Sequence, residues 1–380
     1  MILASWIGLV ATVAVAGSMF YLLAVDSVRR LRSRPHKNTS ALPPVSVLKP
    51  LAGREDGLEY FLETFFVQDY PQYELLFAVE QQDDPAVPVV EALLARHPQV
   101  PAKLLVVGQS AYANAKVWSM QKMFEQASYD ILVVTDSDAS VDTRYLRDVA
   151  AYFEDPKVGA VTHLYRGVAS SDFWSTLEAL GMSTEFMAGV VVAERLEGMR
   201  FALGPSMAIR RQCLEKIGGF AAIADYLADD FVLGKWAHES GYRVALSHRP
   251  IEHHASSKGF VSTFKHRLRW NKSARFSRPS GYYGQGFTYG LAWSLLVVLI
   301  WPSSISFALL LVSFLLRVWL AFELAHLLED RYVLRRLHYL PIQDLISFIS
   351  WLGGFLGREV TWRNRRYRLL TSGRFARIDV

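Results

Sequence analysis

An unbroken apolar segment near the N-terminus constrains this chain more than any other feature. Residues 2–25 read ILASWIGLVATVAVAGSMFYLLAV, and the first charge is Asp26. About 20 apolar residues are enough for a helix to cross a bilayer. A signal peptide would carry its positive charge before the apolar core, whereas here the basic residues follow it: Arg29, Arg30, Arg32, Arg34 and Lys37. The segment therefore predicts a membrane anchor, and its basic flank predicts that the following domain is cytoplasmic.

Two further apolar stretches lie toward the C-terminus. The first runs from Phe287 to Leu328 and is interrupted at Trp301-Pro302-Ser303-Ser304, which predicts a transmembrane hairpin turning at Pro302. The second, 340–356, precedes a basic tail with Arg358, Arg363, Arg365, Arg366 and Arg368. If 340–356 crossed the bilayer, this tail would lie outside, against the positive-inside bias. We therefore expect an interfacial or re-entrant helix there, with the tail on anionic headgroups or in solvent.

Between these apolar ends the composition is that of a globular domain. Short β-rich runs alternate with segments of helical periodicity, and the runs are VSVLKP (45–50), YELLFAVE (73–80), AKLLVVG (102–108), DILVVTD (130–136) and GAVTHLY (159–165). Such alternation predicts an α/β fold with a mostly parallel sheet. Ligands of these sheets bind outside the carboxyl ends of the strands, so polar residues that follow each run are the functional candidates.

The predicted organisation has five parts: an N-terminal transmembrane anchor (1–27), a basic linker (28–42), a cytoplasmic α/β domain (43–281), a transmembrane helical hairpin (285–328), and an interfacial or re-entrant helix with a basic tail (329–380). Half of the residues (51%) are hydrophobic and 20% are charged, which excludes a disordered or fibrous protein. The lone Cys213 excludes an intramolecular disulfide. The net charge of +5 fits nucleic acid, anionic lipid or a phosphate-bearing substrate equally well. No nucleic-acid partner is expected, because the basic residues cluster beside membrane segments.

Two acids separated by one residue, Asp136 and Asp138, follow the run at 130–136. At a strand end they can offer two carboxylates to one divalent cation, which in turn binds a diphosphate. Mg²⁺ or Mn²⁺ suits such oxygen ligands. An isolated pair of this kind is usually a turn, but its place after a strand in a membrane-tethered α/β domain favours the metal site.

A second acidic segment, Glu80-Gln-Gln-Asp83-Asp84-Pro85, follows the run at 73–80. Its acids could hydrogen-bond the ribose or the base of a nucleotide. Alternatively, Asp84 caps a helix that begins at Ala86. Both interpretations stay open.

A third acidic pair, Asp229 and Asp230, precedes an amphipathic helix through Trp236. An acid at a helix start in a cleft can act as general base on an acceptor hydroxyl. The alternative is an ordinary helix cap.

The last candidate segment is His266-Arg267-Leu268-Arg269-Trp270, in a basic aromatic stretch. Arg269 can donate charge-assisted hydrogen bonds to a departing diphosphate while Trp270 packs beside the nucleotide or acceptor. A basic helix lying on headgroups is the alternative. The pair His253-His254 lacks regular ligand spacing and predicts a loop, and Gly204-Pro205-Ser206 predicts a turn that could line a sugar pocket.

Taken in order, these segments resemble the ceramide glucosyltransferase family, among the processive-type family-2 glycosyltransferases. The resemblance covers nearly the whole chain, in the segments 45–51, 62–66, 69–74, 83–86, Asp136-Ser137, 228–230, Arg269-Trp270, Trp362-Arg363, 366–369 and Ile378-Asp379-Val380. It implies a GT-A nucleotide-sugar domain, a UDP-sugar donor and inverting transfer to a membrane lipid.

The resemblance also assigns roles by motif. Asp84, Asp136 and Asp230 match the family's three acids, and Arg269 and Trp270 match the end of its (Q/R)xxRW signature. The implied nucleotide-binding residues also include Lys49, Pro50, Glu80, Asp83 and Asp229. Two positions depart from the pattern. His266 stands where Gln or Arg is expected, and Asp138 stands where the animal ceramide enzymes have glycine, which strengthens the metal interpretation.

We therefore expect an integral protein of a bacterial inner membrane that transfers glucose from UDP-glucose to a ceramide-type lipid. Bacterial relatives that modify hopanoids make UDP-N-acetylglucosamine and bacteriohopanetetrol the alternative pair. A polysaccharide synthase would need more membrane helices and Gln or Arg at position 266. A non-catalytic adaptor would be expected to lack the three acids, and no oligomeric state is assigned.

Overall fold

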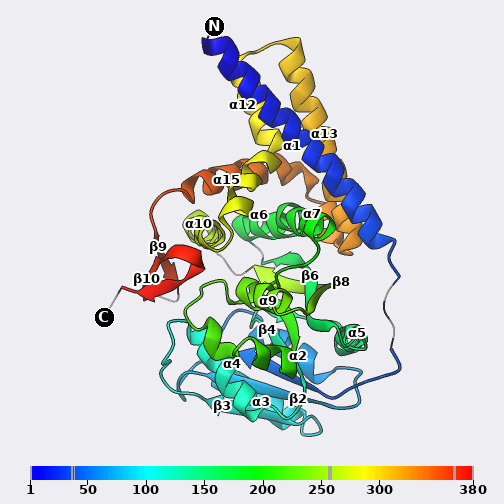
Figure 1. Cartoon of the computed structure of the whole chain (residues 1–380), viewed down its shortest axis with the longest axis vertical. Helices are drawn as coiled ribbons and strands as arrows, with labels where there is room; N and C mark the ends of the chain where they lie inside the picture. The colour runs from blue at the N-terminus through cyan, green and yellow to red at the C-terminus, as the bar shows by residue number, and fades with distance from the viewer. Residues whose placement is uncertain are drawn as a thin grey trace.

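The computed structural model describes residues 2–35, 37, 39–170, 172–255, 259–362 and 365–378. Arg363, Asp379 and Val380, which belong to the basic tail and its terminal motif, lie outside the described residues. An α/β domain occupies one end of the molecule, and a group of long helices extends from the other (Figure 1).

An eight-stranded sheet forms the α/β domain, in the order β3-β2-β1-β4-β7-β6-β8-β5. Its strands are β1 Val45–Pro50, β2 Tyr73–Val79, β3 Ala102–Val106, β4 Ile131–Thr135, β5 Ala139–Ser140, β6 Val158–Ala169, β7 Ser206–Arg210 and β8 Arg243–Ala255. The first four in spatial order are parallel, and β8 is parallel to β6. Antiparallel pairs join β7 to β4 and β6, and β5 to β8. This mixed, mostly parallel sheet confirms the predicted α/β class.

The parallel half explains why its strands read as nearly continuous apolar runs. Every residue of β1 and β2 is buried, as expected where helices cover both faces of a parallel sheet. The register pairs Val45 with Tyr73 and Pro50 with Ala78. Consequently the carboxyl ends of β1 and β2 lie side by side, next to the end of β4.

Eight helices belong to this domain: α2 Leu58–Phe66, α3 Val87–Arg96, α4 Ala115–Gln126, α5 Tyr145–Tyr152, α6 Phe173–Gly181, α7 Met187–Glu197, α8 Arg211–Lys216 and α9 Asp229–Glu239. A π-helical segment, Met182–Phe186, joins α6 to α7. Figure 1 shows α6 and α7, with α10 and α15, as a layer between the sheet and the long helices. This layer connects the two ends of the molecule.

The remaining helices are α1 Ile2–Arg32, α10 Gly259–Ser277, α11 Pro279–Gln285, α12 Gly290–Ile300, α13 Ser304–Leu327, α14 Arg331–Leu334 and α15 Leu340–Gly353. Among the described residues, three helical segments are long and apolar enough to cross a membrane: Ser5–Arg32, Phe173–Glu197 and Ser304–Leu327. The window in Phe173–Glu197 is 78% buried inside the protein, against 28% for each of the other two. The first and last segments therefore leave most of their apolar surface uncovered by the protein, whereas α6–α7 is covered by other parts of the chain.

A bent pair of helices adds one more candidate crossing. Pro279–Thr288 and Gly290–Ile300 meet at 56° and together satisfy the same length and composition criteria. At the bend, a Cβ added to Gly17 of α1 would lie 2.4 Å from the Cα of Gly290. Only glycine permits this approach, as is common where membrane helices pack closely.

The basic tail is folded rather than extended over a surface. It forms a three-stranded antiparallel sheet of β9 Glu359–Trp362, β10 Arg365–Leu369 and β11 Phe375–Arg377. Alternate apolar residues of these strands form a small core with Leu227 of the α/β domain. The apolar side chains of the tail thus pack against the α/β domain, while Arg366 and Arg368 are exposed, and the expected contact of the tail with headgroups or solvent stays a prediction.

Candidate active site

The site is built around Asp136, the first residue after β4. The Nζ atom of Lys49 in β1 donates to the backbone oxygen of Asp136 at 2.6 Å. The Nζ atom of Lys116, in the first turn of α4, lies 2.7 Å from Oδ1 of Asp136. Both lysines are almost completely enclosed. Asp136 is therefore held from two elements, β1 and α4.

The acidic pair of α9 belongs to the same site. Lys116 Nζ also lies 3.4 Å from Oδ2 of Asp229, and Nδ2 of Asn114 donates to Asp229 Oδ1 at 3.4 Å. Asp230 accepts a hydrogen bond from the backbone N–H of Phe231 at 2.8 Å. Lys116 thus bridges Asp136 and Asp229, which sequence reasoning did not anticipate.

Gly204 marks the point on which Asp136 and Asp230 converge. A Cβ added to Gly204 would lie 3.0 Å from Oδ2 of Asp230 and 3.4 Å from Oδ2 of Asp136. Gly204 lies in the predicted turn before β7, and a larger side chain there would fill the space between the two carboxylates. The structure thus brings together two acids that the sequence separates widely.

Electrostatics distinguish Asp230 from its neighbours. Burial, followed by the charge of Asp229, raises the pKa of Asp230 from its ordinary 3.8 to about 6. Burial also raises the pKa of Asp229. Burial by itself lowers the pKa of Lys116. The negative charges of Asp136 and Asp229 outweigh burial, so the pKa of Lys116 is raised. Asp230 is therefore a carboxylate with the proton affinity that a general base near neutral pH requires.

Asp138 is paired with a histidine. Nε2 of His253 in β8 lies 3.3 Å from Oδ2 of Asp138, and the backbone pairs Ala139 with His253. Burial opposes the charge of Asp138, but His253 more than offsets it and lowers the pKa of Asp138 to about 2. The prediction of a loop at His253-His254 was wrong, because both residues extend strand β8. No local signal in the sequence pointed to this pairing.

The oxygen atoms of Asp136 and Asp138 fit a divalent ion only if a ligand completes its coordination. Oδ1 of Asp138 is buried and has no hydrogen-bond partner among the described residues. Within the same residues, no group of three or more His, Cys, Asp and Glu side chains is arranged to hold a metal. Mg²⁺ is commonly bound by one or two carboxylates together with substrate phosphates. A metal held by Asp136 and Asp138 would therefore need phosphate oxygens to complete its coordination.

The acids after β2 contact residues other than those around Asp136 and Asp230. Asp84 accepts the backbone N–H of Gly53, at 3.0 Å to Oδ1 and 3.1 Å to Oδ2, and that of Ala86 at 2.8 Å. The helix begins at Val87 rather than Ala86. Glu80 forms an ion pair with Arg365 at 3.3 Å, and Asp83 is exposed. Asp84 therefore ties the end of β1 to the start of α3, whether or not it also contacts a nucleotide.

Helix α10 carries the signature residues at the edge of the site. Nδ1 of His266 lies 2.5 Å from Oε1 of the buried Glu178, and the His266 and Trp270 rings are 4.4 Å apart. Glu178 is also among the charges that raise the pKa of His253, after Asp138 and Asp136. The signature helix thus approaches the Asp138–His253 pair through Glu178.

Arg267, between the signature residues, was not predicted. Its side chain is buried and donates to the Leu177 backbone oxygen at 2.7 Å, to Gln343 at 2.6 Å and to Ser347 at 2.9 Å. These bonds join α10 to α6 and α15. Arg269 and Trp270 are partly buried on the same helix.

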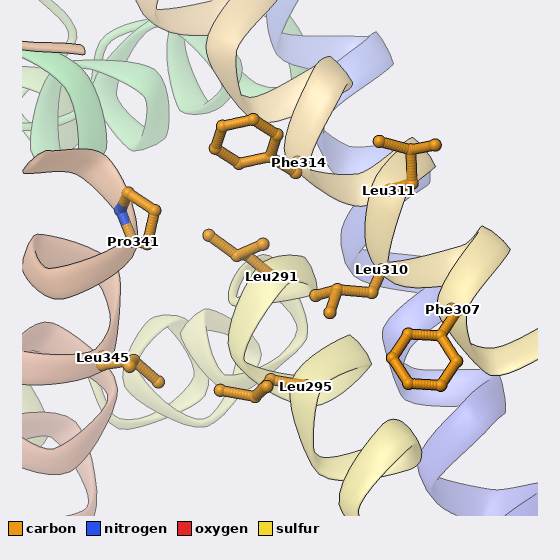
Figure 2. Close-up of a pocket in the computed structure, with 8 residues that line it drawn as sticks. All are labelled: Leu291, Leu295, Phe307, Leu310, Leu311, Phe314, Pro341 and Leu345. Atoms are coloured by element: carbon orange, nitrogen blue, oxygen red, sulfur yellow. The ribbon is translucent and has the colours of Figure 1, made fainter. Parts of the chain in front are cut away.

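A cavity of about 430 Å³ lies among the long helices, away from the acids. Figure 2 shows its apolar lining, contributed by α12, α13 and α15: Leu291, Leu295, Phe307, Leu310, Leu311, Phe314, Pro341 and Leu345. Its volume is within the range of ligand-binding pockets. Only an apolar occupant suits such a lining.

Comparisons with known proteins identify the family of the chain and its fold. The family model for glycosyl transferase family 21 matches residues 9–375. The chain is 29% identical over 279 residues to ceramide glucosyltransferase 3 of Caenorhabditis elegans, covering 71% of this chain and 60% of that protein. It is 25% identical over 280 residues to beta-monoglucosyldiacylglycerol synthase of Trichormus variabilis, covering 70% of this chain and 58% of that protein. The chain thus spans less than two thirds of the length of these relatives.

Among solved structures, a mannosyltransferase of Pyrobaculum calidifontis in complex with GDP-Man and Mn²⁺ superposes with a TM-score of 0.55. The alignment covers 92% of this chain and 97% of that one at 18% identity. At this identity the likeness speaks for the fold alone, and it confirms the predicted GT-A architecture.

Proposed function

Because the chain belongs to glycosyl transferase family 21, we propose that it moves a sugar from a nucleotide-sugar donor to the hydroxyl of a membrane lipid. Our specific hypothesis is UDP-glucose as donor and a ceramide-type lipid as acceptor. The single observation that carries the proposal is the convergence of Asp136 and Asp230 on Gly204. That convergence leaves room for a reacting centre between a strand-end carboxylate and a second carboxylate with a raised pKa.

Asp230 would act as the base. Its carboxylate takes the proton of the lipid hydroxyl, whose oxygen attacks the anomeric carbon as the bond to the diphosphate breaks. One displacement of this kind inverts the anomeric configuration. The pKa of about 6 leaves Asp230 mostly ionised at pH 7 while it still accepts a proton readily.

Asp136 and Asp138 would hold a divalent ion, Mg²⁺ or Mn²⁺, that neutralises charge on the donor diphosphate. Lys49 of β1 and Lys116 of α4 fix the position of Asp136. Arg269 would donate hydrogen bonds to the departing diphosphate, and Trp270, beside His266, would pack against the acceptor. Asp84, through its bonds to Gly53 and Ala86, would shape the nucleotide end of the cleft.

A lipid acceptor is supported by the helices beside the site. The lipid-facing segments Ser5–Arg32 and Ser304–Leu327 would anchor the protein in a bacterial inner membrane, with the α/β domain in the cytoplasm. The apolar cavity in Figure 2 lies between α12, α13 and α15, and α15 is hydrogen-bonded to α10 through Arg267. Apolar tails would stay among these helices while the hydroxyl reaches the cleft.

The test is glycolipid synthesis by the purified full chain in lipid vesicles. Labelled UDP-glucose and UDP-N-acetylglucosamine are supplied separately, each with ceramide, diacylglycerol or bacteriohopanetetrol, and products are identified by mass spectrometry. We expect glucosylceramide from the first donor. Product only from UDP-N-acetylglucosamine and the hopanoid would establish the alternative pair, and no labelled lipid in any arm would refute the proposal.

A further inference from the structure

The C-terminal sheet packs against the α/β domain beside the acidic pair of α9. Strands β9 to β11 sit beside α10 in Figure 1, at the side of the α/β domain. Their core consists of Val360, Tyr367, Leu369 and Phe375 packed on Leu227. The sheet is therefore anchored two residues before Asp229.

Backbone hydrogen bonds fasten the sheet to the same segment. The N–H of Phe375 donates to the Asp225 oxygen at 2.9 Å, and the N–H of Leu227 donates to the Gly373 oxygen at 3.4 Å. The side chain of Asn114, at the start of α4, donates to the Tyr226 oxygen at 2.9 Å and also bonds Asp229. The tail is thus joined directly to the loop that positions the acidic pair of α9.

A second attachment lies at the end of β2. Nη2 of Arg365, the first residue of β10, lies 3.3 Å from Oε1 of Glu80 and 3.5 Å from Oε2. Glu80 is the first residue beyond β2, whose end lies beside the end of β1 that carries Lys49 and Pro50. The tail therefore reaches from the carboxyl end of β2 to the start of α9, along the edge where ligands of such sheets bind.

The cleft needs positive charge if it is to bind an anionic donor. The cleft is lined by carboxylates, whereas a nucleoside diphosphate is an anion. Lys49 and Lys116 are both engaged with Asp136. Arg365 is one-third exposed, and its ion pair with Glu80 uses only Nη2 of a group with five N–H donors.

We propose that Arg365 binds the nucleoside diphosphate of the donor, and that Glu80 holds its guanidinium over the carboxyl end of β2. The inference rests on the proposed function, because it names a donor-binding residue of that site. The sheet closes the nucleotide end of the cleft, and Arg365 supplies cationic charge there. Arginine suits the task because its planar fork matches phosphate oxygens.

The neighbouring Arg366 offers a matched control. It lies on the same strand, its side chain is 58% exposed, and it pairs with Glu359 within the tail sheet at 2.8 Å. Replacing either arginine by glutamine removes one positive charge from the same sheet. Only the Arg365 change removes it from the contact with Glu80.

The test measures UDP binding to the purified full chain by isothermal titration calorimetry in the presence of Mn²⁺. Arg365→Gln should weaken binding about 10- to 100-fold, Arg365→Lys should weaken it less, and Arg366→Gln should bind as the wild type does. Thermal unfolding without UDP should be the same for all four proteins. If Arg365→Gln unfolds at a lower temperature than the wild type, the Arg365→Lys variant provides the test instead. Wild-type affinity of Arg365→Lys for UDP would then overturn the inference.

The outcomes also separate this inference from the proposed function. If the wild type binds UDP and Arg365→Gln binds it equally well, Arg365 is not a donor-binding residue and the proposed function stands. If the wild type binds neither UDP nor GDP, both proposals fail.

Discussion

Two groups of charges, one in the cleft and one inside the helical bundle, differ in how their charges are balanced. The cleft cluster comprises four carboxylates and three basic side chains: Asp136, Asp138, Asp229, Asp230, Lys49, Lys116 and His253. The bundle pair comprises Arg317 of α13 and Asp344 of α15. In that pair, Nε and Nη2 of Arg317 bond the two Asp344 oxygens at 2.8 and 2.9 Å.

The difference lies in charge balance. The bundle pair is neutral, bidentate and almost fully enclosed, and Thr184 accepts a further hydrogen bond from Arg317 at 2.9 Å. In the cleft cluster four carboxylates face three basic side chains, and burial together with Asp229 raises the pKa of Asp230. Each group has a buried atom without a hydrogen-bond partner among the described residues, Oδ1 of Asp138 and Nη1 of Arg317, so the contrast lies in the charges. A closed, balanced pair holds helices together, whereas an excess of carboxylates calls for positive charge that a ligand brings.

The largest effect is expected from Asp230→Asn, which removes the proposed base. Transfer of sugar to lipid should fall 10²- to 10⁴-fold, the usual contribution of a general base. Radiolabelled sugar incorporated into lipid measures this loss. Glu239→Gln, an exposed change at the far end of the same helix, serves as control and should retain activity. Wild-type turnover by Asp230→Asn would rule out the base.

The pKa of Asp230 adds a stability effect to the same variant. Its pKa is higher in the folded protein than the ordinary 3.8, so protonation favours the fold and stability falls as pH rises from about 4 to about 6. Asp230→Asn should therefore be about 1–3 kcal/mol more stable than the wild type at pH 7. Activity of the wild type should rise with pH through about 6. If Asp230→Asn and the wild type unfolded at the same temperature at pH 7, the cleft cluster would not carry the excess of negative charge argued above.

In the bundle pair, neutralising one aspartate should destabilise the protein, whereas Asp230→Asn should stabilise it. Asp344→Asn leaves the Arg317 charge buried without its counter-ion and should lower the free energy of unfolding by about 3–5 kcal/mol. The double variant Arg317→Met/Asp344→Leu removes both charges and should recover most of that loss. Thermal unfolding in detergent compares the three proteins. Equal instability of the single and double variants would show that the pair is not a balanced structural unit.

Removal of divalent ions tests the unsatisfied carboxylates. Chelation with EDTA should lower transfer about 100-fold, and added Mn²⁺ should restore it, because the ion neutralises diphosphate charge. Asp138→Asn should lower the rate to a similar extent and abolish the response to Mn²⁺. Full activity of a metal-free preparation would remove the metal from the proposal.

The smallest effect is expected at Asp84, outside the cleft cluster. Asp84→Ala loses the acceptor of the Gly53 and Ala86 N–H groups and should cost about 1 kcal/mol of stability. Asp84→Asn keeps an oxygen acceptor and should lose less, as measured by thermal unfolding. If Asp84→Asn raises the donor KM without a change in stability, the carboxylate charge itself contacts the nucleotide.

Much of the fold could be predicted because its signals are local. The β-rich runs agree with strands β1 to β4 and β6 to within a few residues, and β4 ends at Thr135, directly before Asp136 as expected. The tail sheet was missed although its signal is also local. Val360, Tyr367, Leu369 and Phe375 are the apolar members of strands whose other residues are mostly charged.

The partners within the site could not be predicted in the same way. Lys116 is an ordinary residue at a helix start until packing places it between Asp136 and Asp229. His253 pairs with Asp138 only because β5 lies beside β8. Gly204 matters through the space it leaves, which no spacing of residues reveals.

The sequence alone determined which segments are apolar enough for a membrane, which alternate as strands and helices, and which acids follow a strand or begin a helix. These properties depend on neighbours along the chain, so periodicity and composition suffice to read them. The tertiary structure alone decided which carboxylates share one cleft, which of them holds a proton more tightly, and that Arg365 pairs with Glu80 and Arg366 with Glu359. Those properties depend on distances through space and on burial, which arise only when segments far apart in the chain pack together.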